Sequence, residues 1–244
     1  MKFQSTAIIC AYNEQKTIAN ILKDVYETHS FHEVIVINDG SNDKTGELIK
    51  EFKKTSNILD VHLLKNRGKG FAMAKGAELA SREYLVFIDA DLSNFTTEHA
   101  CELLTPVLSG MADMVIGQPS ETLIHPDVNP FKNLAGQRAL KKTDILSILQ
   151  KMKTVGYGVE TLINMHFKLN KKVVKHVYLK NLVHPSKFQK TKPHKAIIEF
   201  FMEGCQIVAT TFSNFKITAI KKILKVDYPR GKPRGISPTL FQLR

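Results

Sequence analysis

The sequence predicts an α/β fold with a mostly parallel sheet flanked by helices. Three observations predict it. Short, continuously apolar runs indicate strands that are buried on both faces. Segments of helical periodicity alternate with these runs, as in a parallel sheet whose crossovers are helices. Polar clusters follow four of the runs directly, where the ligands of such sheets bind.

The first half of the chain supplies these elements in regular order. Strands are expected at residues 6–11, 34–37, 61–64, 84–88 and 114–116. Helices are expected at residues 15–27, from Asn42 or Asp43 to Phe52, at 70–80 and at 97–108. Asn42 and Asp43 are residue types that cap the start of a helix. This half, residues 1–118, is expected to bind the main ligand.

The second half is less regular. A proline-rich loop is expected at 119–130, a helical stretch interrupted by Gly156-Tyr157-Gly158 at 134–170, and one or two strands at 171–183. Residues 119–214 are interpreted as an acceptor-side half of the same domain. Residues 215–244 are interpreted as a separate basic segment, with a helix at 215–226 followed by an irregular tail.

Composition and charge narrow the class of protein. Of the 244 residues 43% are hydrophobic, yet no uncharged apolar run approaches the roughly 20 residues that span a bilayer. The apolar stretch among the first residues is too short for a signal peptide, so we expect a cytoplasmic protein. The three cysteines lack CxxC spacing, and Cys10 is expected to be a buried, reduced thiol.

The net charge of +12 is concentrated at the end of the chain. Residues 215–244 contain eight Lys or Arg and one acidic residue, which accounts for +7. Such a segment either docks on an anionic membrane surface, as a peripheral protein does, or exposes a solvated basic face. Nucleic-acid binding is disfavoured, because no basic motif interleaved with aromatic residues occurs.

The pair Asp89 and Asp91 is the most informative motif. Both follow the apolar run 84–88, and two adjacent carboxylates at a buried strand end need a counter-charge. Mg²⁺ or Mn²⁺ suits carboxylate oxygens, with substrate phosphates as further ligands. No GxxxxGK[ST] motif occurs, and the glycines at 68–70 do not complete GxGxxG, which disfavours P-loop and dinucleotide enzymes.

Four motifs in order, IICAYNE, VIVINDGSNDKT, LLKNRGKGFAMAKGA and YLVFIDADL, resemble the donor half of family 2 glycosyltransferases of the Rossmann-like GT-A fold. The resemblance implies an enzyme that binds a UDP- or GDP-sugar with Mg²⁺ or Mn²⁺. Asp39 would accept a hydrogen bond from the base, and Lys69 would lie near the base or diphosphate. The remaining implied residues are Ala11, Tyr12 and Glu14 around base and ribose, and Asp89, Ala90 and Asp91 around ribose and metal.

The second half resembles two subgroups, the polyprenyl- or dolichol-phosphate sugar transferases and the glucosyl-3-phosphoglycerate synthases. Both use acceptors that bear phosphate. The resemblance places Gly136, Gln137 and Arg138 at the sugar and acceptor pocket and makes Glu160 an active-site carboxylate. Arg138 as a surface helix charge and Glu160 as a carboxylate favoured by a helix start remain open.

A basic cluster follows the last expected strand. His184 is a candidate third metal ligand or a surface residue, and the resemblance implies that Lys187 and Lys190 lie near the diphosphate. The preferred acceptor is a polyprenyl phosphate, with a small soluble phosphorylated molecule as the alternative. A sugar-phosphate nucleotidyltransferase is a further alternative, which the acidic AYNE after the first strand disfavours.

Overall fold

The computed structural model describes residues 2–119 and 136–183. The chain divides into two units, Met1–Val208 and Ala209–Arg244, and every described residue belongs to the first. The predictions for residues 120–135 and for residues 184–244, including the basic helix and tail, lie outside the described residues.

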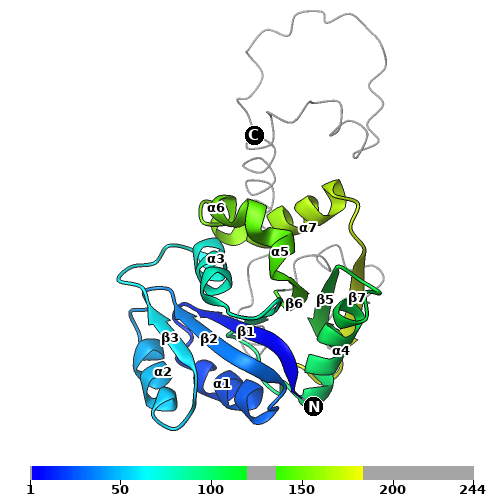
Figure 1. Cartoon of the computed structure of the whole chain (residues 1–244). Coiled ribbons are helices and arrows are strands. Elements are labelled where there is room, and N and C mark those ends of the chain that lie inside the picture. The colour runs from blue at the N-terminus through cyan, green and yellow to red at the C-terminus, as the bar shows by residue number, and fades with distance from the viewer. Residues whose placement is uncertain (1, 120–135, 184–244) are drawn as a thin grey trace, which may run out of the picture. The chain divides into compact units, whose positions relative to one another are not determined.

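The strands of the described residues form one sheet in the order β3-β2-β1-β4-β6-β5-β7 (Figure 1). The strands are β1 (Phe3–Ala11), β2 (Phe31–Asn38), β3 (Leu59–His62), β4 (Tyr84–Asp89), β5 (Met114–Pro119), β6 (Arg138–Lys141) and β7 (Val174–Leu179). All neighbouring pairs are parallel except the two that involve β6. The predicted mostly parallel sheet is therefore confirmed.

Helices cover both faces of the sheet. They are α1 (Ile18–Glu27), α2 (Thr45–Lys53), α3 (Lys69–Leu79), α4 (Thr97–Leu108), α5 (Lys142–Ile145), α6 (Leu149–Met152) and α7 (Val159–Leu169). Short 3₁₀ turns occur at Leu146–Ile148 and Gly156–Gly158. In Figure 1, α1, α2 and α4 lie on one side of the sheet, and α3 lies on the other with α5 to α7.

The core forms because successive strand residues point to opposite faces. Ile9 and its same-face neighbours pack with the buried faces of α1 and α4 in one continuous cluster. Ile8 faces α3, where its side chain lies so near the backbone that a Cβ on Gly76 would come within 2.4 Å of it. The apolar runs are thus buried on both faces, as their composition predicted.

The prediction of helix throughout residues 134–170 is wrong at residues 138–141, which form the strand β6. β6 pairs antiparallel with both β4 and β5, so tertiary pairing overrides the local preference of RALK. The helix expected from Asn42 or Asp43 begins at Thr45, although an Asp43 carboxylate oxygen accepts the Thr45 N–H at 2.9 Å.

The antiparallel direction of β6 determines what reaches the ligand edge of the sheet. Phe87 of β4 pairs with Arg138, the first residue of β6. The residues just before β6 therefore lie beside the carboxyl end of β4, where Asp89 ends the strand.

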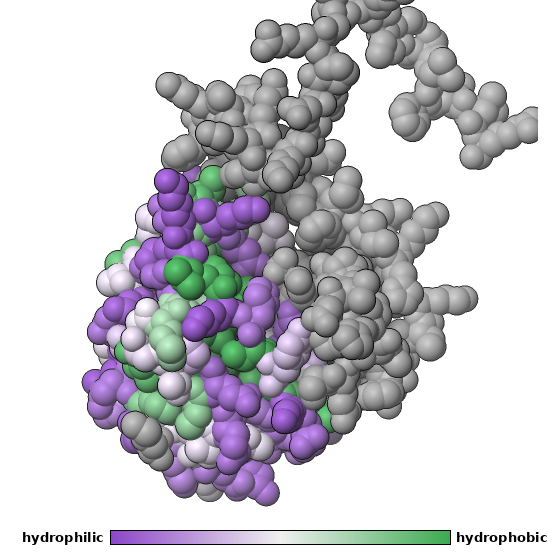
Figure 2. Space-filling view, turned by 90° about the vertical axis from the view of Figure 1, so that its right-hand side faces the viewer, coloured by the Kyte–Doolittle hydropathy of each residue, from purple (hydrophilic) through white to green (hydrophobic). Residues whose placement is uncertain are grey.

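On the face shown in Figure 2, hydrophilic residues predominate among the described ones and hydrophobic residues lie in small groups between them. No helix in residues 2–119 or 136–183 has the length and hydrophobicity needed to cross a membrane.

Candidate active site

The polar clusters after β1, β2, β3 and β4 meet in one pocket at the carboxyl edge of the sheet. Its volume is about 190 Å³. Its lining residues are Cys10, Ala11, Tyr12, Glu14, Asp39, Asn66, Gly68, Lys69, Ala72, Asp89, Ala90 and Asp91. All eight candidate residues of the donor half therefore share one pocket, which we call the donor crevice.

Asp39 follows β2 and holds the loop before α3. Its two carboxylate oxygens accept the backbone N–H groups of Arg67 and Gly68, each at 2.8 Å. Burial raises the pKa of Asp39, and these two hydrogen bonds oppose that rise. Gly68 has φ of +90°, a conformation that glycine adopts without strain. Asp39 is thus a fixed, buried acceptor at the wall of the crevice.

The loop after β1 is tied to the loop after β2. The Asn13 N–H donates to the Ser41 hydroxyl at 3.0 Å, and the Asn13 side-chain oxygen accepts the Asn42 N–H at 2.9 Å. The Glu14 N–H donates to the Thr45 hydroxyl at 2.8 Å. These bonds hold Tyr12, whose side chain is partly exposed, at the crevice.

Lys69 begins α3 and lies between two carboxylates. Its ammonium is 2.7 Å from Asp89 Oδ1 and 2.6 Å from Glu160 Oε1. Burial alone would lower the pKa of Lys69, but the two carboxylates outweigh it and raise the pKa above its ordinary value. Sequence reasoning put Lys69 near the base or diphosphate and missed this pairing, because Glu160 is distant in sequence.

Asp89 is enclosed by protein groups. Its second oxygen, Oδ2, accepts the side-chain N–H of Gln137 at 2.8 Å. The backbone of Gly136 approaches so closely that a Cβ there would lie 2.0 Å from Oδ2. Gly136 and Gln137 thus reach the crevice wall beside the carboxylate pair, as the direction of β6 requires.

Arg138 is fully buried, so its interpretation as a surface helix charge is wrong. Its Nη1 donates to the Glu160 carbonyl at 3.4 Å and to the Asn164 side-chain oxygen at 3.2 Å. Burial lowers the pKa of Arg138, while Glu160 and Asp89 act to raise it. The guanidinium therefore links β6 to the start of α7, where the Glu160 side chain is also buried.

The donor set of the crevice suits a hard divalent cation that takes most of its ligands from substrate. Asp89 and Asp91 both line the crevice, and both oxygens of Asp89 contact protein donors. Within residues 2–119 and 136–183 no group of three Asp, Glu, His or Cys side chains could hold a metal. Mg²⁺ is commonly bound through one or two carboxylates and substrate phosphates, so Asp91 fits this role. His184, Lys187 and Lys190 lie outside the described residues.

Cys10, near the end of β1, lines the crevice together with Asp39 and Asp89. The thiol is free, as expected, but only partly buried. Burial raises its pKa, so the thiol form dominates at neutral pH and nucleophilic reactivity is low.

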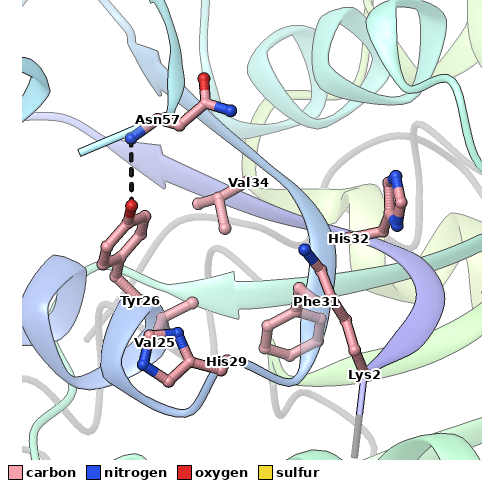
Figure 3. A pocket seen from close by; sticks show the side chains of 8 residues that line it. All are labelled: Lys2, Val25, Tyr26, His29, Phe31, His32, Val34 and Asn57. Atoms are coloured by element: carbon pink, nitrogen blue, oxygen red, sulfur yellow. Dashed lines mark hydrogen bonds between the residues drawn. The ribbon is translucent and has the colours of Figure 1, made fainter.

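A second pocket, of about 160 Å³, lies at the opposite end of the sheet, where β2 begins. Figure 3 shows its side chains, among them Lys2, Tyr26, His29 and His32 around the ring of Phe31. Its described lining residues include no carboxylate, so the donor crevice is the better candidate for a metal–diphosphate site.

The sequence model of glycosyl transferase family 2 matches residues 6–176, well over half of the chain. The chain therefore belongs to this family. Poly-beta-1,6-N-acetyl-D-glucosamine synthase of Staphylococcus aureus (strain COL) is 40% identical over 87 residues, 35% of this chain and 21% of that protein. The synthase of Staphylococcus epidermidis is 42% identical over 85 residues, 34% of this chain and 21% of that protein. The match spans about a fifth of these relatives.

The fold is similar to that of glucosyl-3-phosphoglycerate synthase from Mycobacterium tuberculosis. The complex of that enzyme with Mn²⁺, uridine diphosphate and phosphoglyceric acid gives a TM-score of 0.62 at 20% identity, covering 86% of this chain and 77% of that one. Its complex with Mg²⁺ and uridine diphosphate gives 0.60 at 21% identity, covering 86% and 78%. The likeness confirms the predicted GT-A-type α/β fold.

Proposed function

We propose that this chain transfers a sugar from a nucleoside-diphosphate sugar, with uridine diphosphate the preferred carrier, to an acceptor that bears phosphate. The observation that carries the proposal is the convergence of Asp39, Lys69, Asp89 and Asp91 in one crevice at the strand ends. Membership of glycosyl transferase family 2 supports it. So do the structural neighbours, which were crystallised with uridine diphosphate and Mn²⁺ or Mg²⁺.

Each side chain has a chemical role in this proposal. Asp39 offers a charged acceptor to a base N–H, which makes the stronger class of hydrogen bond. Asp91 would hold Mg²⁺ or Mn²⁺, which supplies positive charge to the departing diphosphate. Asp89 acts differently: Lys69 and Gln137 fix its carboxylate, so it shapes the wall beside the ribose.

The acceptor side contains Gln137, Arg138 and Glu160. A phosphate acceptor is already ionised near neutral pH, so it needs no strong general base, and Glu160 then orients the acceptor. A polyprenyl phosphate is our preferred acceptor, because the basic residues 215–244 would draw the enzyme to an anionic membrane surface. A small soluble acceptor is the second candidate, favoured by the neighbour bound to phosphoglyceric acid.

The first test compares wild type with Asp91→Asn. Calorimetry measures the binding of UDP- and GDP-sugars with and without Mn²⁺, and an activity assay measures turnover. We expect the variant to lose cation-dependent binding and to lower turnover about 100-fold or more, because charge stabilisation of the leaving group is lost. Glu98→Gln, which removes a carboxylate from α4, is the matched control and should change neither.

Turnover of Asp91→Asn close to that of wild type would contradict the metal role. Preference of wild type for nucleoside triphosphates over every sugar nucleotide would instead indicate a nucleotidyltransferase. Product analysis with a polyprenyl phosphate and with 3-phosphoglycerate then separates the two acceptor classes.

A further inference from the structure

A chain of polar side chains outside the donor crevice connects β3 to the loop that carries Asp39. Asn38 and His62 are register partners at the ends of β2 and β3. The Asn38 side-chain nitrogen lies 3.1 Å from His62 Nδ1, and His62 Nε2 lies 3.0 Å from Asp60 Oδ2. Asp60 also contacts the Lys53 ammonium. His62 is not among the lining residues of the crevice, so any effect it has on a ligand passes through Asn38.

The hydrogen-bond pattern determines where the His62 proton sits. The Ser41 N–H donates to the Asn38 side-chain oxygen at 3.1 Å, so the amide nitrogen of Asn38 faces His62. That nitrogen can only donate, and His62 Nδ1 must therefore accept. In this arrangement the proton on Nε2 points to Asp60. Protonation of Nδ1 would remove this acceptor from Asn38.

The packing leaves no room for a different arrangement of Asn38. Asn38 is 6% exposed, and a Cβ on Gly46 of α2 would lie 2.8 Å from its amide nitrogen. Both ends of the amide are thus occupied, one by Ser41 and the other by His62. A buried amide with both groups satisfied has one orientation, and removal of either partner leaves an unpaired polar atom.

Asn38 in turn orders the loops of the crevice. The Ser41 hydroxyl accepts the Asn13 N–H at 3.0 Å, which ties down the loop after β1. Asp39, the next residue after Asn38, grips the Arg67 and Gly68 N–H groups before α3. The Asn38 amide therefore contacts the loop after β2, and that loop in turn contacts the loop after β1 and the loop before α3.

We propose that His62 is a positioning residue for donor binding: through Asn38 it holds the loops that recognise the nucleoside. The inference deepens the proposed function and rests on it. It predicts a specific kinetic signature, because the nucleoside is bound equally in the ground state and the transition state. Loosening of these loops therefore raises KM for the donor and leaves kcat nearly unchanged.

The test compares two variants. His62→Phe keeps a flat ring but cannot accept from Asn38, and we expect it to raise the donor KM about fivefold to tenfold with kcat within about twofold of wild type. His62→Asn places an acceptor oxygen near the position of Nδ1, and we expect it to restore the donor KM to within about twofold. A general folding defect would lower kcat and would not distinguish Asn from Phe.

A second readout needs no donor. Nitrogen-15 NMR of the His62 ring in the free protein at neutral pH should show a protonated Nε2 and an unprotonated Nδ1. A ring protonated at Nδ1, or a His62→Phe variant with the wild-type donor KM, overturns this inference while the proposed function stands. A wild-type protein with no affinity for any sugar nucleotide overturns the proposed function, and this inference with it.

Discussion

Lys69 is the side chain on which the charge balance of the crevice depends. Its side chain is about three-quarters buried, and its ammonium lies between two carboxylates. Because its pKa in the folded protein is above the ordinary value, its contribution to stability is fully present below that ordinary value. It is lost only when the pH rises into the strongly alkaline range.

Replacement of Lys69 by Met should therefore be costly at neutral pH. Removal of one partner from a buried ion network leaves uncompensated charge, and we expect a loss of about 3 kcal/mol in the free energy of unfolding. The loss should persist at neutral pH and shrink only as the pH rises into the strongly alkaline range, where Lys69 of the wild type loses its proton. Urea denaturation over a pH series measures both effects.

Lys75→Met is the matched control, since Lys75 lies six residues further along the same helix. We expect it to change the free energy of unfolding by less than about 0.5 kcal/mol, with no comparable dependence on pH. Equal losses in the two variants would show that the contacts of Lys69 with Asp89 and Glu160 do not stabilise the folded protein.

The sequence indicated which residues gather in the crevice but not which of them touch. Asp39, Asp89 and Asp91 stand at strand ends, and a parallel sheet brings strand ends to one edge. The contact between Lys69 and Glu160 joins residues that no local periodicity relates. The alternative of a surface helix charge at Arg138 stayed open in the sequence for the same reason, because the burial of Arg138 depends on pairing with β4 and β5.

At the level of elements, long periodic segments were predictable and short ones were not. The helix expected at residues 97–108 is α4 as observed, and Thr96 with His99 forms a capping box at its start. β6 has only four residues, and nothing in RALK distinguishes a strand from a helical turn. Its strand form comes from the hydrogen bonds that its two neighbours offer.

The start of α3 packs unusually close to the α6 segment. A Cβ on Gly70 would lie 2.2 Å from the Met152 carbonyl oxygen, and a Cβ on Gly68 would lie 3.2 Å from Gly156. The two glycines of GKG therefore let backbone approach backbone. This approach brings Lys69, which stands between them, within reach of Glu160 at the start of α7.

Gly70→Ala should force α3 away from Met152. Overpacking against backbone has no flexible side chain to absorb it, so we expect a loss of about 2–3 kcal/mol in stability and reduced donor binding. Gly110→Ala is the control: its Cβ meets open space, and only the positive φ of +74° costs about 1 kcal/mol. Thermal denaturation and donor titration of both variants measure the difference. A Gly70→Ala variant no less stable than Gly110→Ala would contradict the close approach.

At the level of the whole molecule, the antiparallel direction of β6 brings the two groups of site residues together. The donor loops follow parallel strands, whereas Gly136 and Gln137 precede the antiparallel strand β6. A strand that runs the opposite way presents its first residues at the edge where the parallel strands present their last. The two groups of residues thus meet although they come from opposite ends of their strands, an arrangement that hydrophobic pattern alone does not specify.

The uneven charge of the whole chain leads to a final prediction. Residues 215–244 carry +7 of the net +12, and each lysine near an anionic surface contributes about 1 kcal/mol. Replacement of Lys216, Lys221, Lys222 and Lys225 by Gln should therefore weaken binding of the full chain to phosphatidylserine vesicles about 100-fold or more. Replacement of four exposed lysines on or beside α1 and α2 (Lys23, Lys44, Lys50 and Lys54) is the control of equal charge.

Vesicle co-sedimentation distinguishes local from global attraction. If residues 215–244 are the docking element, only the first set of changes causes the large loss of binding. Salt should also weaken wild-type binding, because the interaction is screened beyond about 8 Å at physiological ionic strength. Equal effects of the two sets would instead assign the attraction to net charge. Absence of wild-type binding to anionic vesicles would remove the reason for preferring a lipid-linked acceptor over a soluble phosphate, while the donor crevice and its chemistry would be unaffected.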